Sequence, residues 1–95
     1  MLKNILITLI LTSIMLGQGR FTISGKIIDK ASGQVLSGAN VFETITEVGT
    51  SSNAEGEYLL LLPEGNYNFK ISYIGYNSIE REVYLNKNIN IDFKL

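Results

Sequence analysis

The sequence predicts an all-β protein: a seven-stranded antiparallel β-sandwich that follows an N-terminal signal peptide. Beyond residue 20, apolar and polar residues alternate as they do in half-buried strands, and no stretch keeps a helical repeat for long. Turn-forming residues separate these stretches at intervals of roughly 8–12 residues, which is the spacing typical of a sandwich. Because no helix is available to cover the apolar faces of the strands, these faces must pack against each other as two sheets.

Residues 1–19 are predicted to be the signal peptide and residues 20–95 the folded domain. Lys3 supplies a positive charge, an apolar run over residues 5–16 follows, and two glycines lie at positions 17 and 19. This order of charge, apolar core and small residues is typical of a secretory signal. The run would rise only about 18 Å as a helix, too short for a hydrocarbon layer of ~30 Å. We therefore expect cleavage after residue 19 and a mature chain without a membrane span; a buried core helix or an uncleaved anchor is the alternative.

Seven stretches are predicted to be strands. Their ranges are 21–29, 39–44, 47–52, 57–62, 67–73, 78–85 and 88–95. In the first stretch Phe21, Ile23 and Ile27 share one face, and the fifth and seventh stretches keep the same alternation. In the sixth, Arg81 interrupts the apolar face. We expect the apolar faces to point inward and the polar faces outward.

Four turns separate the longer strands. Residues 30–34 close the first strand, and residues 53–56 form a reversal in which Gly56 favours a positive φ. Residues 63–66 begin with a proline, which fixes φ and cannot donate to a ladder, and continue with glycine and asparagine. Residues 86–87 turn the chain into the last strand. Each turn lies where the alternation stops, which supports the predicted ranges.

The fourth strand departs from the alternating pattern, because residues 58–62 are apolar on both faces. With Tyr58 in the core, Leu59 and Leu61 point outward. They are expected either to lie under a loop or in a central strand, or to form a contact patch for another domain or protein. Tyr76 and Tyr84 are candidates to extend such a patch, since each has polar neighbours and tyrosine suits a wet interface.

The composition excludes several kinds of catalytic site. The chain has no histidine and no cysteine, so it lacks the residues of a zinc peptidase site and of Ser-His-Asp or Cys-His catalysis, and it forms no disulfide. Its formal net charge is −1 and its basic residues are scattered, so no nucleic-acid interface is expected. We expect no enzyme activity, no metal and no cofactor.

Two groups of acidic residues have a second interpretation. Glu80 and Glu82 are two apart on one face of a strand and could form a carboxylate pair, although a solvated edge is expected. Asn53, Glu55 and Glu57 near a turn could hold calcium weakly, but they lack the regular spacing of a calcium loop. Neither group is therefore taken as a site.

Five blocks carry a resemblance to a known family. Their ranges are 23–29, 32–41, 49–58, 62–67 and 71–76, the last reading Ser-Tyr-Ile-Gly-Tyr. In this order they resemble the carboxypeptidase-regulatory-like domain, a prealbumin (transthyretin)-like sandwich. The nearest variant resembles the N-terminal extension of TonB-dependent outer-membrane receptors for starch and glycan uptake in Bacteroidetes-like bacteria. The resemblance covers residues 21–95 and implies a Greek-key order of the strands.

The resemblance implies a non-enzymatic, exported interaction or accessory module of the cell envelope, related to the extension of a nutrient-uptake receptor. An envelope protein or an adjacent receptor domain is the expected partner, and the expected location is periplasmic, outer-membrane-associated or secreted in a Gram-negative bacterium. The alternative is a free-standing secreted carbohydrate-binding or adhesive module, in which Tyr76 and Tyr84 stack on sugar rings. The absence of tryptophan speaks against this alternative. The chain is either free-standing or the front of a longer reading frame.

Overall fold

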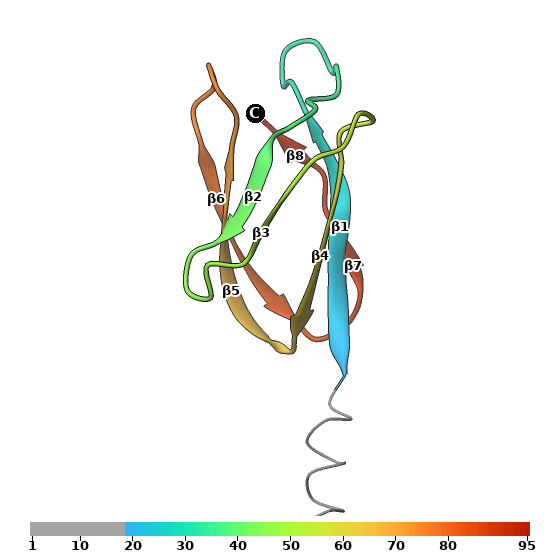
Figure 1. Cartoon of the computed structure of the whole chain (residues 1–95), viewed down its shortest axis with the longest axis vertical. Coiled ribbons are helices and arrows are strands. Elements are labelled where there is room, and N and C mark those ends of the chain that lie inside the picture. The colour runs from blue at the N-terminus through green and yellow to red at the C-terminus, as the bar shows by residue number, and fades with distance from the viewer. Residues whose placement is uncertain (1–18) are drawn as a thin grey trace, which may run out of the picture.

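The computed structural model describes residues 19–95, and the predicted signal peptide lies outside the described residues except for its last position. The described part contains eight strands and no helix (Figure 1). The strands are β1 (Arg20–Ile28), β2 (Asn40–Glu43), β3 (Gly49–Ser51), β4 (Glu57–Pro63), β5 (Gly65–Ser72), β6 (Ile79–Leu85), β7 (Ile89–Asn90) and β8 (Phe93–Lys94). They form two sheets packed face to face, which confirms the predicted β-sandwich. No helix in residues 19–95 is long and apolar enough to cross a membrane.

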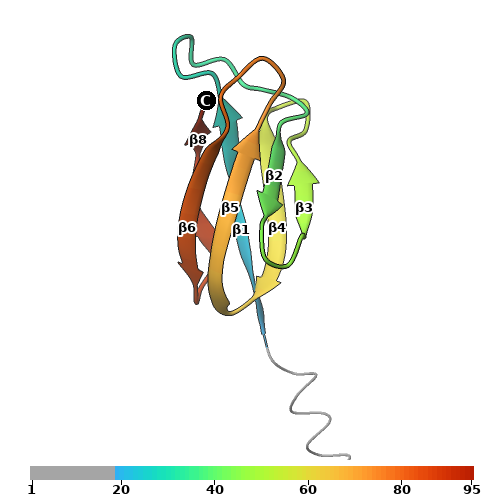
Figure 2. The same cartoon turned by 90° about the vertical axis from the view of Figure 1, so that its left-hand side faces the viewer.

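The two sheets divide the chain between them in an order that is not sequential. One sheet has the order β4-β1-β7, with β8 pairing with β1 further along, and the other has the order β3-β2-β5-β6. Figure 2 shows the second sheet facing the viewer, with β1 and β4 behind it. β1 and β4 pair antiparallel in a long ladder that runs from Arg20 opposite Pro63 to Lys26 opposite Glu57. β4 is therefore an edge strand, and β1 is central.

The end of the chain differs from its prediction as one antiparallel strand over residues 88–95. It forms two short strands, β7 and β8, and both run parallel to β1. The direction follows from the strand before it: β6 ends where Leu85 lies opposite Gly65, at the end of the sandwich where β1 begins. The short turn after β6 crosses to the other sheet at that end. The segment that follows therefore starts beside the beginning of β1 and runs parallel to it.

Side-chain oxygens interrupt this last strand. Asn88 Oδ1 accepts a hydrogen bond from the Thr22 N–H (3.0 Å), and Asp92 Oδ1 accepts one from the Lys26 N–H (2.8 Å). These two oxygens take places that backbone carbonyls would fill in a regular ladder. Between them, the backbone N–H of Ile91 donates to Ser24 O (2.7 Å). Alternation in the sequence predicts the inward face of this segment but not its break.

The core lies between the sheets and is built from the inward faces of the predicted strands. Its buried members are Ile23, Ile27, Leu36, Ala39, Val41, Tyr58, Leu60, Leu62, Phe69, Ile71, Leu85 and Phe93. The Tyr58 hydroxyl donates to the carbonyl of Ile91 (2.6 Å), and its ring lies 5.6 Å from that of Phe93. This bond gives the buried hydroxyl a partner and ties the beginning of β4 to the end of the chain.

Arg81 lies on the edge strand β6 and contacts the core from that side of the sandwich. It lies opposite Phe69 in the β5–β6 ladder and so belongs to the inward face of β6. Its guanidinium carbon is 5.7 Å from the centre of the Phe93 ring, a cation–π contact worth about 0.5–1 kcal/mol at an exposed site. An inward-pointing charge on an edge strand also discourages pairing with another chain.

Glu43 is a fully buried carboxylate, although it lies on the apolar face of β2. Its Oε1 accepts hydrogen bonds from the backbone N–H groups of Ile45 (3.0 Å) and Thr46 (2.7 Å) and from the Thr46 hydroxyl (3.0 Å), and its Oε2 accepts one from Asn68 N (2.9 Å). Burial acts to raise its pKa, but the bonds from Thr46, Asn68 and Ile45 outweigh burial, and the net pKa is lowered. Glu43 thereby holds the β2–β3 loop against β5.

Candidate functional site

Leu59 and Leu61 lie side by side on the outer face of β4, where they are 59% and 52% exposed. They alternate with Tyr58, Leu60 and Leu62, which are buried, so the predicted orientation of the strand is correct. β4 is an edge strand and no loop covers the two leucines. The interpretation that places them under a loop or in a central strand is therefore wrong.

Tyr84 lies on a different surface. It is opposite Asn66 on the outward face of β6, in the other sheet, and its hydroxyl donates to Glu64 Oε1 (3.0 Å). Because the two sheets turn their outer faces away from each other, Tyr84 and the two leucines face opposite sides of the sandwich. The predicted residues therefore do not form one continuous patch.

Tyr76 takes part in a contact between two loops. Its hydroxyl donates to Asp29 Oδ2 (2.6 Å), and its ring is 5.6 Å from that of Tyr73. Asp29 Oδ1 accepts from the N–H groups of Ala31 and Ser32. The bond from Tyr76, followed by that from Ser32, lowers the pKa of Asp29 from 3.8 to about 2. Tyr76 is half-buried and anchored, and it lies in a loop that is distant from Tyr84 in the fold, so the two rings form no common platform for a sugar.

The Tyr76–Asp29 bond leads to a pH prediction. In the Tyr76→Phe variant the pKa of Asp29 should rise from about 2 toward 3.8, as measured by an NMR titration of its carboxyl. Because the folded pKa lies below the unfolded one, the bond stabilises the fold above pH 3.8, and this contribution is lost as the pH falls through about 2. Tyr73→Phe is the control, since it leaves the Tyr76 hydroxyl in place. An unchanged Asp29 pKa in Tyr76→Phe would contradict the assignment.

The outer edge of β4 carries backbone groups that have no partner in the ladder. Ile27 N donates to Gly56 O (2.8 Å), which sets the alternation of hydrogen-bonded pairs between β1 and β4. In this alternation the even-numbered residues of β4 direct their N–H and C=O groups toward β1. The odd-numbered residues direct theirs away from it, and these include Leu59 and Leu61.

Two further contacts agree with this assignment and show where the free edge stops. At one end of β4, Glu57 O accepts from Asn53 N (2.9 Å) and Glu57 N donates to Asn53 Oδ1 (2.8 Å). At the other end, Pro63 has no N–H, and its carbonyl accepts from the Tyr67 hydroxyl (2.6 Å). Between these ends, the backbone N–H and C=O groups of Leu59 and Leu61 have no hydrogen-bond partner in the described part of the chain. The same two residues expose apolar side chains.

The other edges in the described part of the chain are protected. β3 has three residues, and β7 and β8 have two each. β6 is long, but it carries the charged run Glu80, Arg81 and Glu82. Short edge strands, charges and interruptions are the features that prevent unwanted pairing between sheets. β4 has none of these between Glu57 and Pro63.

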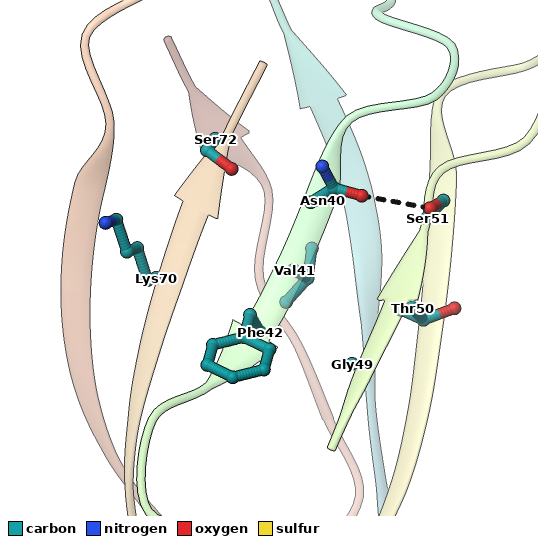
Figure 3. Close-up of a pocket in the computed structure, with 8 residues that line it drawn as sticks. All are labelled: Asn40, Val41, Phe42, Gly49, Thr50, Ser51, Lys70 and Ser72. Atoms are coloured by element: carbon teal, nitrogen blue, oxygen red, sulfur yellow. Dashed lines mark hydrogen bonds between the residues drawn. The ribbon is translucent and has the colours of Figure 1, made fainter. Parts of the chain in front are cut away.

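A surface hollow of about 460 Å³ lies on the outer face of the second sheet; it is shallow and has a mixed polar and apolar lining (Figure 3). Asn40 accepts a hydrogen bond from Ser51 there (3.1 Å), beside Phe42 and Lys70. No acidic side chain lines this hollow, and residues 19–95 hold no group of three His, Cys, Asp or Glu side chains placed to bind a metal ion. This hollow therefore offers no catalytic arrangement.

The two acidic groups weighed from the sequence have ordinary structural surroundings. Glu80 and Glu82 point outward and lie opposite Lys70 and Asn68 in the β5–β6 ladder. In the other group, Asn53 Oδ1 accepts from the N–H groups of both Glu55 and Glu57, which fixes the turn before β4. The side-chain oxygen of Asn53 is therefore used to stabilise the turn through backbone hydrogen bonds.

Comparison with known proteins agrees with this geometry. A sequence profile of the CarboxypepD_reg-like domain family matches residues 23–95, which include all of the described strands except the first residues of β1. The chain belongs to this family.

Two proteins contain regions similar to this CarboxypepD_reg-like domain. One is TonB-dependent receptor P3 of Formosa agariphila, 29% identical over 69 residues, which are 73% of this chain and 7% of that protein. The other is bacillopeptidase F of Bacillus subtilis, 36% identical over 66 residues, which are 67% of this chain and 5% of that protein. The chain thus spans a small part of either relative, and it is similar to both over most of its own length.

Sequence reasoning found the two leucines of this domain but missed the features that make their strand distinctive. The free backbone groups of β4 depend on which strand lies beside it, and that is a non-local property. Glu43 could have been noticed as an acidic residue on an otherwise apolar face, and Asp29 as the residue that precedes a turn. Neither signal reveals its partner, because Asn68 and Tyr76 are far away in the sequence.

Proposed function

We propose that this CarboxypepD_reg-like domain is a non-enzymatic docking module of the cell envelope, and that it docks through β4. The observation that carries the proposal is the coincidence of exposed leucine side chains and free backbone groups at Leu59 and Leu61. An extended segment can add to such an edge: main-chain hydrogen bonds supply affinity, and side chains on alternate positions supply specificity.

An envelope location is supported by the similarity to a TonB-dependent receptor and by the signal peptide predicted for residues 1–19. The partner proposed on these grounds is an envelope protein or an adjacent receptor domain. The absence of histidine and cysteine supports a non-enzymatic role. Complete burial of the two half-exposed leucines would contribute roughly 2–3 kcal/mol to docking.

The double variant Leu59→Glu/Leu61→Glu tests this proposal. Both side chains point to solvent, so the free energy of unfolding should change little, whereas two carboxylates in an apolar contact should abolish association. The measurement is in-cell cross-linking of the full chain, followed by identification of the cross-linked envelope proteins.

A matched control is Ile45→Glu/Val48→Glu, which adds the same charge at exposed apolar residues of the β2–β3 loop. The control should keep the cross-links that the β4 variant loses. If both variants retain the same cross-linked partners, β4 is not the docking site.

A further inference from the structure

We propose that the strand that pairs with the free edge of β4 is the β4 strand of a second copy of this chain. This inference rests on the proposed docking role of β4. The two strands pair antiparallel about a two-fold axis at Leu60 and join the β1–β4 sheets of the two copies edge to edge. The resulting interface is isologous, so it closes at two copies.

The register follows from the free backbone groups. A two-fold axis at Leu60 places Leu59 opposite Leu61 of the second copy, and Leu61 opposite its Leu59. Each of these pairs exchanges two N–H···O=C bonds, as in a hydrogen-bonded antiparallel pair. The four bonds use every free backbone group of the two leucines in both copies. An axis at Leu59 or at Leu61 would pair one of these residues with itself and leave the other unpaired.

The side chains fit the same register. Leu59 and Leu61 of both copies meet on one outer face as directly opposed apolar pairs, which covers surface that is half-exposed in the single chain. At each end of the pairing, Glu57 lies opposite Pro63 of the second copy, so no like charges face each other. Lys26 and Arg20 are the β1 neighbours of these two residues, and they add positive charge beside the carboxylate.

The surroundings of β4 leave room for this strand and limit its length. An open hollow of about 420 Å³ lies beside the edge and is lined in part by Thr50, Asn53 and Leu59. The bonds of Asn53 to Glu57 and of Tyr67 to Pro63 stop the ladder at four bonds. Such an interface is smaller than the 1,200–2,000 Å² of a standard stable complex, so we expect a weak, reversible dimer.

Charge-pair variants of the full chain test both the dimer and its register. In Leu59→Lys/Leu61→Glu, each lysine lies opposite a glutamate of the second copy; in Leu59→Lys/Leu61→Lys, each lysine lies opposite a lysine. Sedimentation equilibrium up to about 1 mM protein gives the dissociation constant of each, and thermal unfolding checks the fold. We expect the second variant to dimerise at least about tenfold more weakly than the first. Mixing it with Leu59→Glu/Leu61→Glu should restore association.

Each outcome separates this proposal from the proposed function. Equal dissociation constants for the two double variants would overturn the register. A chain that stays monomeric at every concentration, while Leu59→Glu/Leu61→Glu still loses its envelope cross-links, would overturn the dimer and leave β4 as a docking site for a strand of another protein. A monomeric chain whose cross-links do not depend on β4 would overturn both proposals.

Discussion

Replacing Gly25 by alanine should cost about 3 kcal/mol or more of the free energy of unfolding, by displacing the end of the chain from β1. A Cβ atom at Gly25 would overlap the carbonyl oxygen of Ile91, and it would lie 3.0 Å from Asp92 Oδ1. Its φ of 155° is also one that residues with a side chain rarely adopt. The Ile91 carbonyl cannot easily move away, because the buried Tyr58 hydroxyl is bonded to it at 2.6 Å.

The expected loss is large for a domain of this size, whose total stability is roughly 4–11 kcal/mol. Urea unfolding measures it, and hydrogen exchange at Ile91 and Leu95 shows whether the last segment has detached. Gly33→Ala is the control: Gly33 also has a positive φ, of 74°, but no atom lies within 4 Å of its Cβ position. It should cost only about 1 kcal/mol of backbone strain. Equal losses in the two variants would show that the close approach of Ile91 is unimportant.

Removing the buried carboxylate of Glu43 should destabilise the fold by a similar amount. Glu43→Ala leaves the N–H groups of Ile45, Thr46 and Asn68 without their acceptor, which we expect to cost about 3–4 kcal/mol. Glu43→Gln keeps the shape but replaces one acceptor oxygen by a donor and should cost about 2 kcal/mol. Glu47→Gln, at an exposed residue of the same loop, is the control and should change stability by less than about 0.5 kcal/mol.

The contribution of Glu43 should also depend on pH. Its pKa in the folded protein is lowered below the ordinary value of 4.5, so its stabilising effect is present above pH 4.5 and is lost as the pH falls through the lower folded value. Urea unfolding at a series of pH values should therefore give a shallower loss of stability below pH 4.5 in Glu43→Gln than in the natural chain. Parallel curves for the two proteins would contradict this role.

Strand bounds are predicted accurately where they depend on residues that are close together in the sequence, and poorly where they depend on distant partners. The strands from β1 to β6 all begin and end within two residues of their predicted bounds, because alternation and turn residues are read along the chain itself. Within that tolerance β3 keeps only three residues of the predicted range 47–52, since Glu43 holds residues 44–48 as a loop. The last strand is divided because Asp92 and Asn88 bond to β1, which is 66 residues away in the sequence.

The predicted contact residues show the same limit. The outward direction of Leu59 and Leu61 depends on the period of two within one strand, and the structure has it as predicted. Whether Tyr84 shares their surface depends on which sheet β6 joins, and the sandwich places it on the other side. Tyr76 is held by Asp29, a partner that no local pattern indicates.

The sequence by itself thus determined the fold class, the inward faces of the strands, the absence of histidine and cysteine chemistry, and the apolar character of β4. These properties are set by residue type and by repeats along a single segment. Only the tertiary structure decided that β4 is an edge, that its free backbone groups belong to the two exposed leucines, and that Glu43 and Asp29 are tied to distant partners. Hydrogen bonding between strands joins residues far apart in the chain, and a pattern along the chain does not state which segments will lie side by side.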